Sequence, residues 1–234
     1  MKRFSTALLF VGVCGSAMAA APIAPFTAEY SATRNGSELG RTTIQLRANE
    51  DSTWTLRTST VGTSALARMA GLDVVEESRL RWRDGRIETL AYSFRQDAAM
   101  SKKRRRGEFN WNANEVRMID GDSDASYALV PGTVDRHALT LALISDLVDG
   151  SSAYDYKVAM KSEIEDIRYT DCGDSTLSVP AGEYAVRCLE RKREKRTSTS
   201  WFAESIGWLP VQIEQIERKG DTITLKMISL RRDG

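Results

Sequence analysis

The densest group of chemically active side chains is a run of five cations, Lys102, Lys103, Arg104, Arg105 and Arg106. In an extended chain the even-numbered members would project from one face and the odd-numbered members from the other. Arginine forks fit phosphate oxygens, so the run is a candidate site for lipid phosphates or an anionic envelope polymer. The alternative is a solvated hairpin whose charges protect a sheet edge from aggregation. A second basic cluster at residues 191–196 would strengthen the binding hypothesis if it lay on a nearby strand.

Metal and catalytic chemistry have weaker support. Residues 120–124 place carboxylates at positions one, three and five of a calcium loop, but Ala125 and Pro131 stand where that loop needs Gly and Glu. His137 is the only histidine, which argues against a zinc site or a hydrolytic triad and favours a surface or supporting role. We therefore expect no enzyme, metal or cofactor. Paired carboxylates remain as candidates for glycosidase chemistry, although no spacing selects two of Glu29, Glu76 and Glu77.

Aromatic side chains recur in segments that alternate like β-strands. Such residues usually fill a core, which is the default interpretation. In a deeply bent sheet, the same inward-facing set could line a ligand cavity. The aromatic candidates for a lining are Trp54, Trp82, Tyr92, Phe94 and Trp111.

The elements that must position these residues follow an export signal. Lys2 and Arg3 precede an apolar run over residues 4–13, and Ala17-Met18-Ala19 has the small-x-small pattern of a signal peptidase site. Residues 1–19 are therefore predicted to be a removed signal peptide, and residues 20–234 to form a single β-rich domain in the periplasm. No later apolar run is long enough for a transmembrane helix. Val13 precedes Cys14 where a lipoprotein signal needs a small residue, so lipidation is not expected.

Charge and cysteine content narrow the alternatives further. The 33 basic and 32 acidic side chains nearly balance, so the composition gives no support for nucleic-acid binding. Removal of Cys14 with the signal leaves Cys172 and Cys188, an even pair in an oxidising compartment. A disulfide between them is the first expectation, and two buried free thiols are the alternative.

Most of the remaining chain alternates with period two between turn residues, which predicts antiparallel hairpins. Asn35-Gly36 and Asp84-Gly85 are strong hairpin signals. Residues 135–148 depart from this pattern: apolar residues recur at helical spacing, Asp135 stands at the N-cap and Asp149-Gly150 follows. Residues 62–72 favour a short helix or flap. The expected fold is mainly β, a single curved antiparallel sheet or half-open barrel with one covering helix.

A series of landmarks resembles a known family. They run in the order Tyr30, Gly36, Gly40, Glu77-Ser78, Asp84-Gly85, Phe109-Asn110-Trp111, Asp135, Leu139, Val179-Pro180-Ala181-Gly182, Trp201-Phe202 and Leu209-Pro210-Val211. The set resembles an exported bacterial family catalogued as a domain of unknown function (DUF 3108), over nearly the whole mature chain. The resemblance implies secretion and a curved antiparallel β architecture, and carries over no catalytic residues. A looser architectural likeness is to lipoprotein-carrier half-barrels, in which a bent sheet and a helical lid enclose acyl chains.

Three functions follow as expectations. The first is a non-catalytic periplasmic protein that holds a lipid or other apolar envelope ligand in the concavity of the sheet, with the basic run at the head group. The second is an envelope scaffold that contacts a protein or cell-wall polymer. The third is an unrecognised envelope hydrolase.

Overall fold

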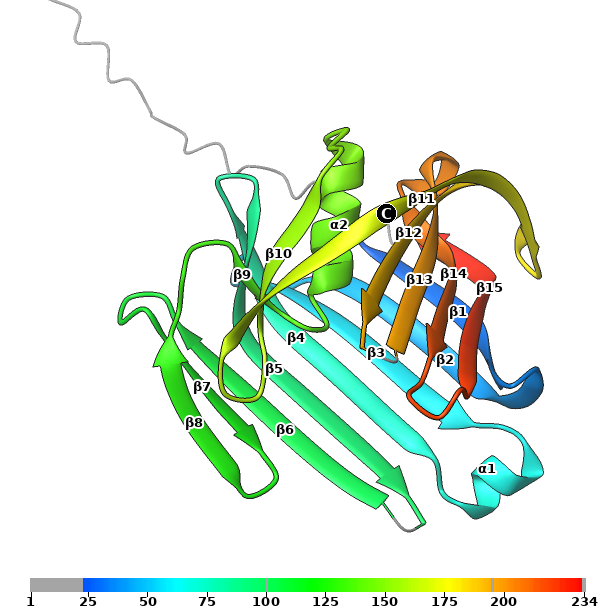
Figure 1. Ribbon diagram of the computed structural model, residues 1–234, viewed down its shortest axis with the longest axis horizontal. Helices are drawn as coiled ribbons and strands as arrows, with labels where there is room; N and C mark the ends of the chain where they lie inside the picture. Colours follow the sequence, from blue (N-terminus) through cyan, green and yellow to red (C-terminus); the bar gives the residue numbers. More distant parts are fainter. Residues whose placement is uncertain (1–22, 100, 195, 233–234) are drawn as a thin grey trace, which may run out of the picture.

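The computed structural model describes residues 23–99, 101–194 and 196–232, which form one long sheet curled around a central helix (Figure 1). The predicted signal peptide and Cys14 lie outside the described residues. The first eight strands are β1 (Phe26–Arg34), β2 (Ser37–Ala48), β3 (Trp54–Gly62), β4 (Asp73–Arg83), β5 (Arg86–Ala98), β6 (Ser101–Asn110), β7 (Glu115–Asp120) and β8 (Ser123–Ala128). The remaining strands are β9 (Thr133–Asp135), β10 (Tyr154–Ala159), β11 (Ile164–Val179), β12 (Gly182–Arg193), β13 (Arg196–Ala203), β14 (Leu209–Ile216) and β15 (Thr222–Arg232).

The strand order confirms the predicted open, curved sheet. The order is β8-β7-β6-β5-β4-β3-β2-β1-β15-β14-β13-β12-β11-β10-β9, so the pairing of β1 with β15 joins the two halves. The expectation of an entirely antiparallel sheet is wrong at one end, where β9 and β10 pair in parallel. Parallel neighbours need a long crossover, and helix α2 (Leu139–Val148) supplies it between these two strands.

The tight hairpins form where the sequence predicts them. Asn35 and Gly36 both have positive φ values, 49° and 77°, and so do Asp84 and Gly85, at 51° and 74°. Two successive residues with positive φ give a turn whose twist matches that of the flanking strands, and Asn-Gly and Asp-Gly tolerate this conformation best. These turns fix the register of β1 with β2 and of β4 with β5.

Helix α2 lies inside the concavity of the sheet and differs from the prediction in two ways. It begins at Leu139, because Asp135 ends β9 and residues 136–138 form a turn. The Asp135 carboxylate still accepts the backbone N–H groups of His137 and Ala138, at 2.8 and 3.0 Å. The helix is also buried around most of its surface, since both halves of the sheet enclose it. Its buried residues are Leu139, Leu141, Leu143, Ile144, Ser145 and Leu147.

The smaller elements lie at the ends of strands. The predicted flap at residues 62–72 contains the short helix α1 (Ala65–Met69), with Ser64 as its N-cap. A 3₁₀ turn, η1 (Glu204–Ile206), follows β13. Within the described parts of the chain, no helix has the length and apolar character needed to cross a membrane.

A disulfide joins Cys172 of β11 to Cys188 of β12, as expected from the cysteine count, with their Cα atoms 5.0 Å apart. The register between the strands shifts at this point, so that Asp171 faces Leu189 and Gly173 faces Cys188. Cys172 is therefore the extra residue of a β-bulge, a device that redirects a side chain. A disulfide fits an oxidising compartment.

Candidate functional site

A buried hydrogen-bond network attaches the start of α2 to the sheet. The Asp135 carboxylate accepts hydrogen bonds from the hydroxyls of Ser78 on β4 and Thr89 on β5, both at 2.8 Å. The His137 ring lies between two hydroxyls, with Nδ1 3.0 Å from Ser78 Oγ and Nε2 2.8 Å from Thr58 Oγ1. Burial raises the pKa of Asp135, while the charge of His137 and the hydrogen bonds oppose that shift.

The network contains Ser, His and Asp, but its geometry is not that of a hydrolytic triad. In a triad the imidazole lies between the carboxylate and the nucleophile. Here Ser78 occupies the middle position, in contact with both Asp135 and His137. Ser78 and Asp135 are completely buried and His137 is only 9% exposed, so of the two roles expected for His137 the surface position is wrong and the supporting one fits. The arrangement holds α2 in place and offers no exposed nucleophile.

The space directly beneath α2 is nearly filled. A void of about 30 Å³ remains between the helix and the inner face of the sheet, bordered by Tyr30, Leu56 and Ile144 among others. One water molecule needs about 10–15 Å³ of such space, so the void has room for a few water molecules at most. The deep part of the concavity is thus core.

A larger hollow opens beside α2, toward strands β11 to β14, and we call it the inner hollow. Its volume is about 260 Å³. Its apolar wall comes from α2, from strands β10, β11 and β14 and from Met160, which follows β10, and its rim carries four arginines. The apolar lining residues are Leu139, Leu143, Val158, Met160, Ile167 and Ile213, and the arginines are Arg136, Arg191, Arg193 and Arg196.

Three of the four rim arginines are neutralised by carboxylates. Arg136 pairs with Glu76 at 3.3 Å, Arg193 with Glu165 at 2.6 Å and Arg196 with Glu217 at 3.0 Å. Arg191 makes no ion pair within residues 23–99, 101–194 and 196–232.

Arg191 and two hydroxyls form a group of anion-binding type in the inner hollow. The Tyr169 hydroxyl interacts with the side chains of Arg191 and Ser198, and all three residues line the hollow. Burial raises the pKa of Tyr169, so the hydroxyl keeps its proton at neutral pH, and the positive charge of Arg191 opposes that rise. A guanidinium beside two neutral hydroxyls can bind a phosphate or carboxylate.

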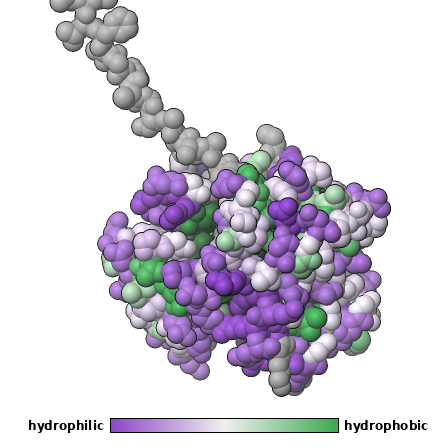
Figure 2. Space-filling model, turned by 45° about the horizontal axis from the view of Figure 1, so that its top comes forward, coloured by the Kyte–Doolittle hydropathy of each residue, from purple (hydrophilic) through white to green (hydrophobic). Residues whose placement is uncertain are grey.

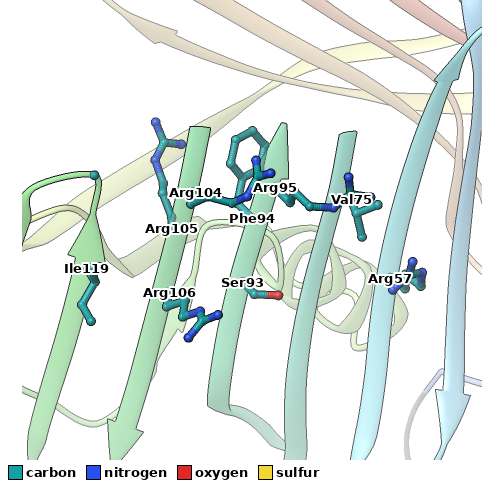
Figure 3. A pocket seen from close by; sticks show the side chains of 10 residues that line it. Arg57, Val75, Ser93, Phe94, Arg95, Arg104, Arg105, Arg106 and Ile119 are labelled. Atoms are coloured by element: carbon teal, nitrogen blue, oxygen red, sulfur yellow. The ribbon is translucent and has the colours of Figure 1, made fainter. Parts of the chain in front are cut away.

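A second hollow, the outer hollow, lies on the face of the sheet that points away from α2. It has a volume of about 580 Å³ (Figure 3). Arg95 and Arg104 lie next to each other above neighbouring strands, and both pair with Asp97, at 2.6 and 2.7 Å. Arg57 pairs with Glu77 at 2.9 Å, whereas Arg106 makes no ion pair among the described residues. The non-arginine side chains of this surface are Val75, Ser93 and Ile119.

The predicted basic run alternates along β6 as expected for an extended strand. Lys102, Arg104 and Arg106 belong to the outer face, while Lys103 and Arg105 belong to the face of α2. Arg105 pairs with Asp120 at 3.0 Å, and its guanidinium lies 5.1 Å from the centre of the Phe94 ring. The second basic cluster lies on β12 and β13, in the other half of the sheet, so it does not meet the condition under which it would have strengthened the binding hypothesis.

The predicted aromatic residues lie mostly in the core. Trp54 and Trp82 form an edge-to-face pair, with ring centres 5.1 Å apart, against the main core cluster. Tyr92 belongs to a second cluster and donates its hydroxyl to Glu76 at 2.6 Å. Phe94 packs against the same cluster, on the face that carries Arg105. Trp111 borders a third, open hollow and donates its indole N–H to the Thr89 carbonyl at 2.7 Å. Ligand contact by these five residues stays a prediction.

The acidic candidates do not converge. Glu29 is exposed on β1, Glu76 faces α2, and Glu77 faces the outer hollow. The calcium-like residues form the β7–β8 hairpin, where Asp120 and Asp124 pair with arginines. No group of three or more metal-ligating side chains with suitable placement occurs in the part of the chain that the structure describes.

Sequence reasoning missed the inner hollow because its members come from separate elements. Tyr169, Arg191 and Ser198 lie on three adjacent strands, β11, β12 and β13. The signal available in the sequence was the density of cations at residues 191–196, which did not single out Arg191.

Figure 2 shows a face of the molecule on which hydrophilic residues dominate and hydrophobic ones form small separate groups.

Comparisons with solved structures place the fold among barrel-like proteins. A crystal structure of a beta-barrel-like protein of domain of unknown function DUF1849 from Brucella abortus matches with a TM-score of 0.63 and 10% identity, over 92% of this chain and all of that one. The MucA/MucB complex structure from Pseudomonas aeruginosa matches with a TM-score of 0.36 and 15% identity. That match covers 90% of this chain and 52% of the other, so this chain spans about half the length of the matched protein.

A search of curated proteins finds no match. The family model described as a protein of unknown function, DUF3108, matches residues 26–228 and therefore every strand from β1 to β14 and most of β15. The curved sheet with its enclosed helix, and the family resemblance of the landmark residues, lead to the same conclusion: this chain belongs to the DUF3108 family.

Proposed function

We propose that this chain is a non-catalytic binding protein of the periplasm that holds part of an anionic amphiphile, such as a lipid, in the inner hollow. The single observation that carries the proposal is Arg191, a cation without a carboxylate partner among the described residues, set between an apolar wall and two hydroxyls. The anionic group would bind Arg191, Tyr169 and Ser198, and an apolar arm would lie against α2.

The size of the hollow limits what it can hold. Ligand pockets usually measure about 300–1,000 Å³, and the inner hollow has about 260 Å³. The ligand would therefore be small, or only one arm of it would be enclosed while the rest stays outside. The nearly solid space beneath α2 argues against a carrier that buries several acyl chains there.

Ligand retention tests this proposal. The exported protein, purified in mild conditions, should carry an anionic lipid-like molecule detectable by native mass spectrometry and by solvent extraction. Arg191→Gln should lower the affinity by about tenfold or more, because a hydrogen bond to a charged group contributes about 1.5–3 kcal/mol. Lys192→Gln is the matched control, since Lys192 is next in the chain, faces the other side of β12 and pairs with Glu190 at 2.7 Å.

Two results would contradict the proposal. One is a protein that is empty after every mild purification and binds no anionic amphiphile when it is supplied. The other is an Arg191→Gln variant that retains ligand as well as Lys192→Gln does.

A second candidate function is an envelope scaffold that contacts an anionic polymer or acidic protein through the outer hollow. Arg106 supports it, because this cation has no ion-pair partner in the described residues and lies beside Ser93 and Ile119. A photo-crosslinking residue at Ser93 should then give one dominant product in intact cells, and the same residue at the exposed Ser175 of β11 should not. Equal labelling at both positions would exclude the scaffold role of this surface.

A further inference from the structure

Two strand connections meet at one end of the sheet. The β3–β4 connection contains α1, and the end of β5 reaches the same end of the sheet (Figure 1). A backbone hydrogen bond of 2.6 Å, from the Ala99 N–H to the Ala70 carbonyl, joins the two. We call residues 61–73 together with residues 97–99 and 101–104 the sheet tip.

The sheet tip exposes its largest apolar side chains. Leu66 is 80% exposed and Met69 is 84% exposed, and Val61 at the end of β3 is 53% exposed. Leu66 and Met69 are three residues apart in α1, so they lie on the same face of the helix. A pair of large apolar residues at such exposure, on one short projecting helix, indicates a surface that contacts something else.

Close packing behind α1 fixes this orientation. Ala67 is the buried residue of the helix and lies against Gly62, where an added Cβ would stand 2.6 Å from the Ala67 Cβ. The absence of a side chain at Gly62 therefore lets α1 pack tightly through Ala67. With Ala67 inward, Leu66 and Met69 point to solvent.

The charges of the sheet tip are positive in excess. Arg104 is paired with Asp97, and Asp73 is paired with Arg95 of β5, at 2.7 and 2.8 Å. These pairs use both acidic residues of the sheet tip. The three remaining cations make no ion pair within the described ranges: Arg68, Lys102 and Lys103.

We propose that the sheet tip docks on the surface of an anionic lipid bilayer. Leu66 and Met69 would enter the boundary between head groups and acyl chains, and Arg68, Lys102 and Lys103 would remain at the level of the lipid phosphates. Exposed apolar side chains flanked by cations are the combination that binds such an interface, because burial of apolar area and attraction to anionic lipid add together. The complementary charge selects a membrane over an apolar protein surface. This role is separate from ligand binding in the inner hollow.

Vesicle sedimentation of the exported protein, with its N-terminus verified by mass spectrometry, tests the proposal. Vesicles of phosphatidylethanolamine and phosphatidylglycerol should retain the protein, whereas vesicles of phosphatidylcholine alone should bind it much more weakly. The double variant Leu66→Ser and Met69→Ser should lose about tenfold or more in partition coefficient. Lys102→Gln with Lys103→Gln should bind anionic vesicles more weakly and with less dependence on salt.

Matched controls exist elsewhere on the molecule. Val148→Ser with Ile216→Ser removes two other exposed apolar residues, at 46% and 37% exposure. Lys161→Gln with Lys219→Gln removes two cations outside the sheet tip. Both controls should bind vesicles like the unchanged protein, and circular dichroism should verify that every variant is folded.

Three results would overturn the proposal. The unchanged protein could fail to bind any vesicle, or the Leu66 and Met69 double variant could bind as well as the Val148 and Ile216 control. A concentration-dependent dimer in the absence of lipid, abolished by the same double variant, would assign the apolar pair to self-association. Loss of vesicle binding would leave the Arg191 test unaffected, so the two proposals fail independently.

Discussion

At the scale of single residues, Asp135 has the most demanding surroundings. Its carboxylate is fully buried and accepts hydrogen bonds from two hydroxyls and two backbone N–H groups. A buried carboxylate is tolerated only when its oxygens are satisfied in this way. The residue connects β4, β5 and the start of α2, so it positions the helix that forms one wall of the inner hollow.

Replacement of Asp135 by Ala should therefore destabilise the protein by roughly 3 kcal/mol or more, because it leaves several buried donors without an acceptor. Chemical denaturation monitored by circular dichroism measures this change. Asp155→Ala is the control: Asp155 pairs with Arg168 at an exposed position and should cost less than about 1 kcal/mol. Similar losses for the two variants would show that the network contributes little.

At the scale of elements, the β11–β12 pair carries the disulfide, the bulge and two lining residues of the inner hollow, Tyr169 and Arg191. The bulge at Cys172 brings its sulfur to Cys188, two residues before Glu190 and three before Arg191. On the other side, β12 pairs with β13 so that Arg191 is opposite Ser198. The covalent link therefore fixes the strand that presents Arg191.

The double variant Cys172→Ser and Cys188→Ser should be less stable by about 3 kcal/mol, since the bond closes a loop with a sequence separation of 16. A reducing agent should lower the denaturation midpoint of the unchanged protein to a similar degree and leave the variant unaffected. Native material in which both thiols alkylate freely would contradict the bond itself.

At the scale of the whole molecule, two half-sheets share one enclosed helix and a set of buried and half-buried tyrosines. Tyr30 is fully buried and donates its hydroxyl to the Pro210 carbonyl at 2.7 Å, which joins β1 to β14. Tyr127 of β8 donates to the Met160 carbonyl at 2.6 Å and brings one end of the open sheet to the strands at the other end. These side-chain hydrogen bonds therefore connect strands that have no backbone pairing with each other.

These tyrosines predict the alkaline limit of stability. Burial raises the pKa of Tyr127 from 10.0 to about 12 and raises the pKa values of Tyr30, Tyr92, Tyr156 and Tyr169 as well. Above about pH 10 the unfolded chain loses these protons while the folded chain keeps them, so the unfolding free energy should fall. The stability is fully present below pH 10 and decreases as the pH rises toward the folded pKa values.

The slope should be about 1.4 kcal/mol per pH unit for a fully buried tyrosine such as Tyr30. Denaturant midpoints measured from pH 8 upward check this expectation, and Tyr30→Phe should show a shallower slope than the unchanged protein. A stability that is independent of pH above 10 would contradict the assignment.

Local patterns in the sequence determined much of this protein. Several features depend only on residues that are near neighbours in the sequence, and the structure confirms them. They are the positive-φ turns at Asn35-Gly36 and Asp84-Gly85, the alternation along β6, the pairing of two cysteines and the apolar helix after Asp135. The family resemblance also held, because it used landmarks whose order is visible along the chain.

Only the tertiary structure decided which distant residues share a site. Enclosure of α2 by both halves of the sheet filled the deep part of the concavity and buried His137 against Thr58 and Ser78. The strand order separated the two basic clusters. The same folding placed Tyr169, Arg191 and Ser198 in one hollow and left Leu66 and Met69 in solvent. The physical reason is that period and turn type specify a strand and its register, whereas the curvature of a long sheet depends on the packing of all its strands together.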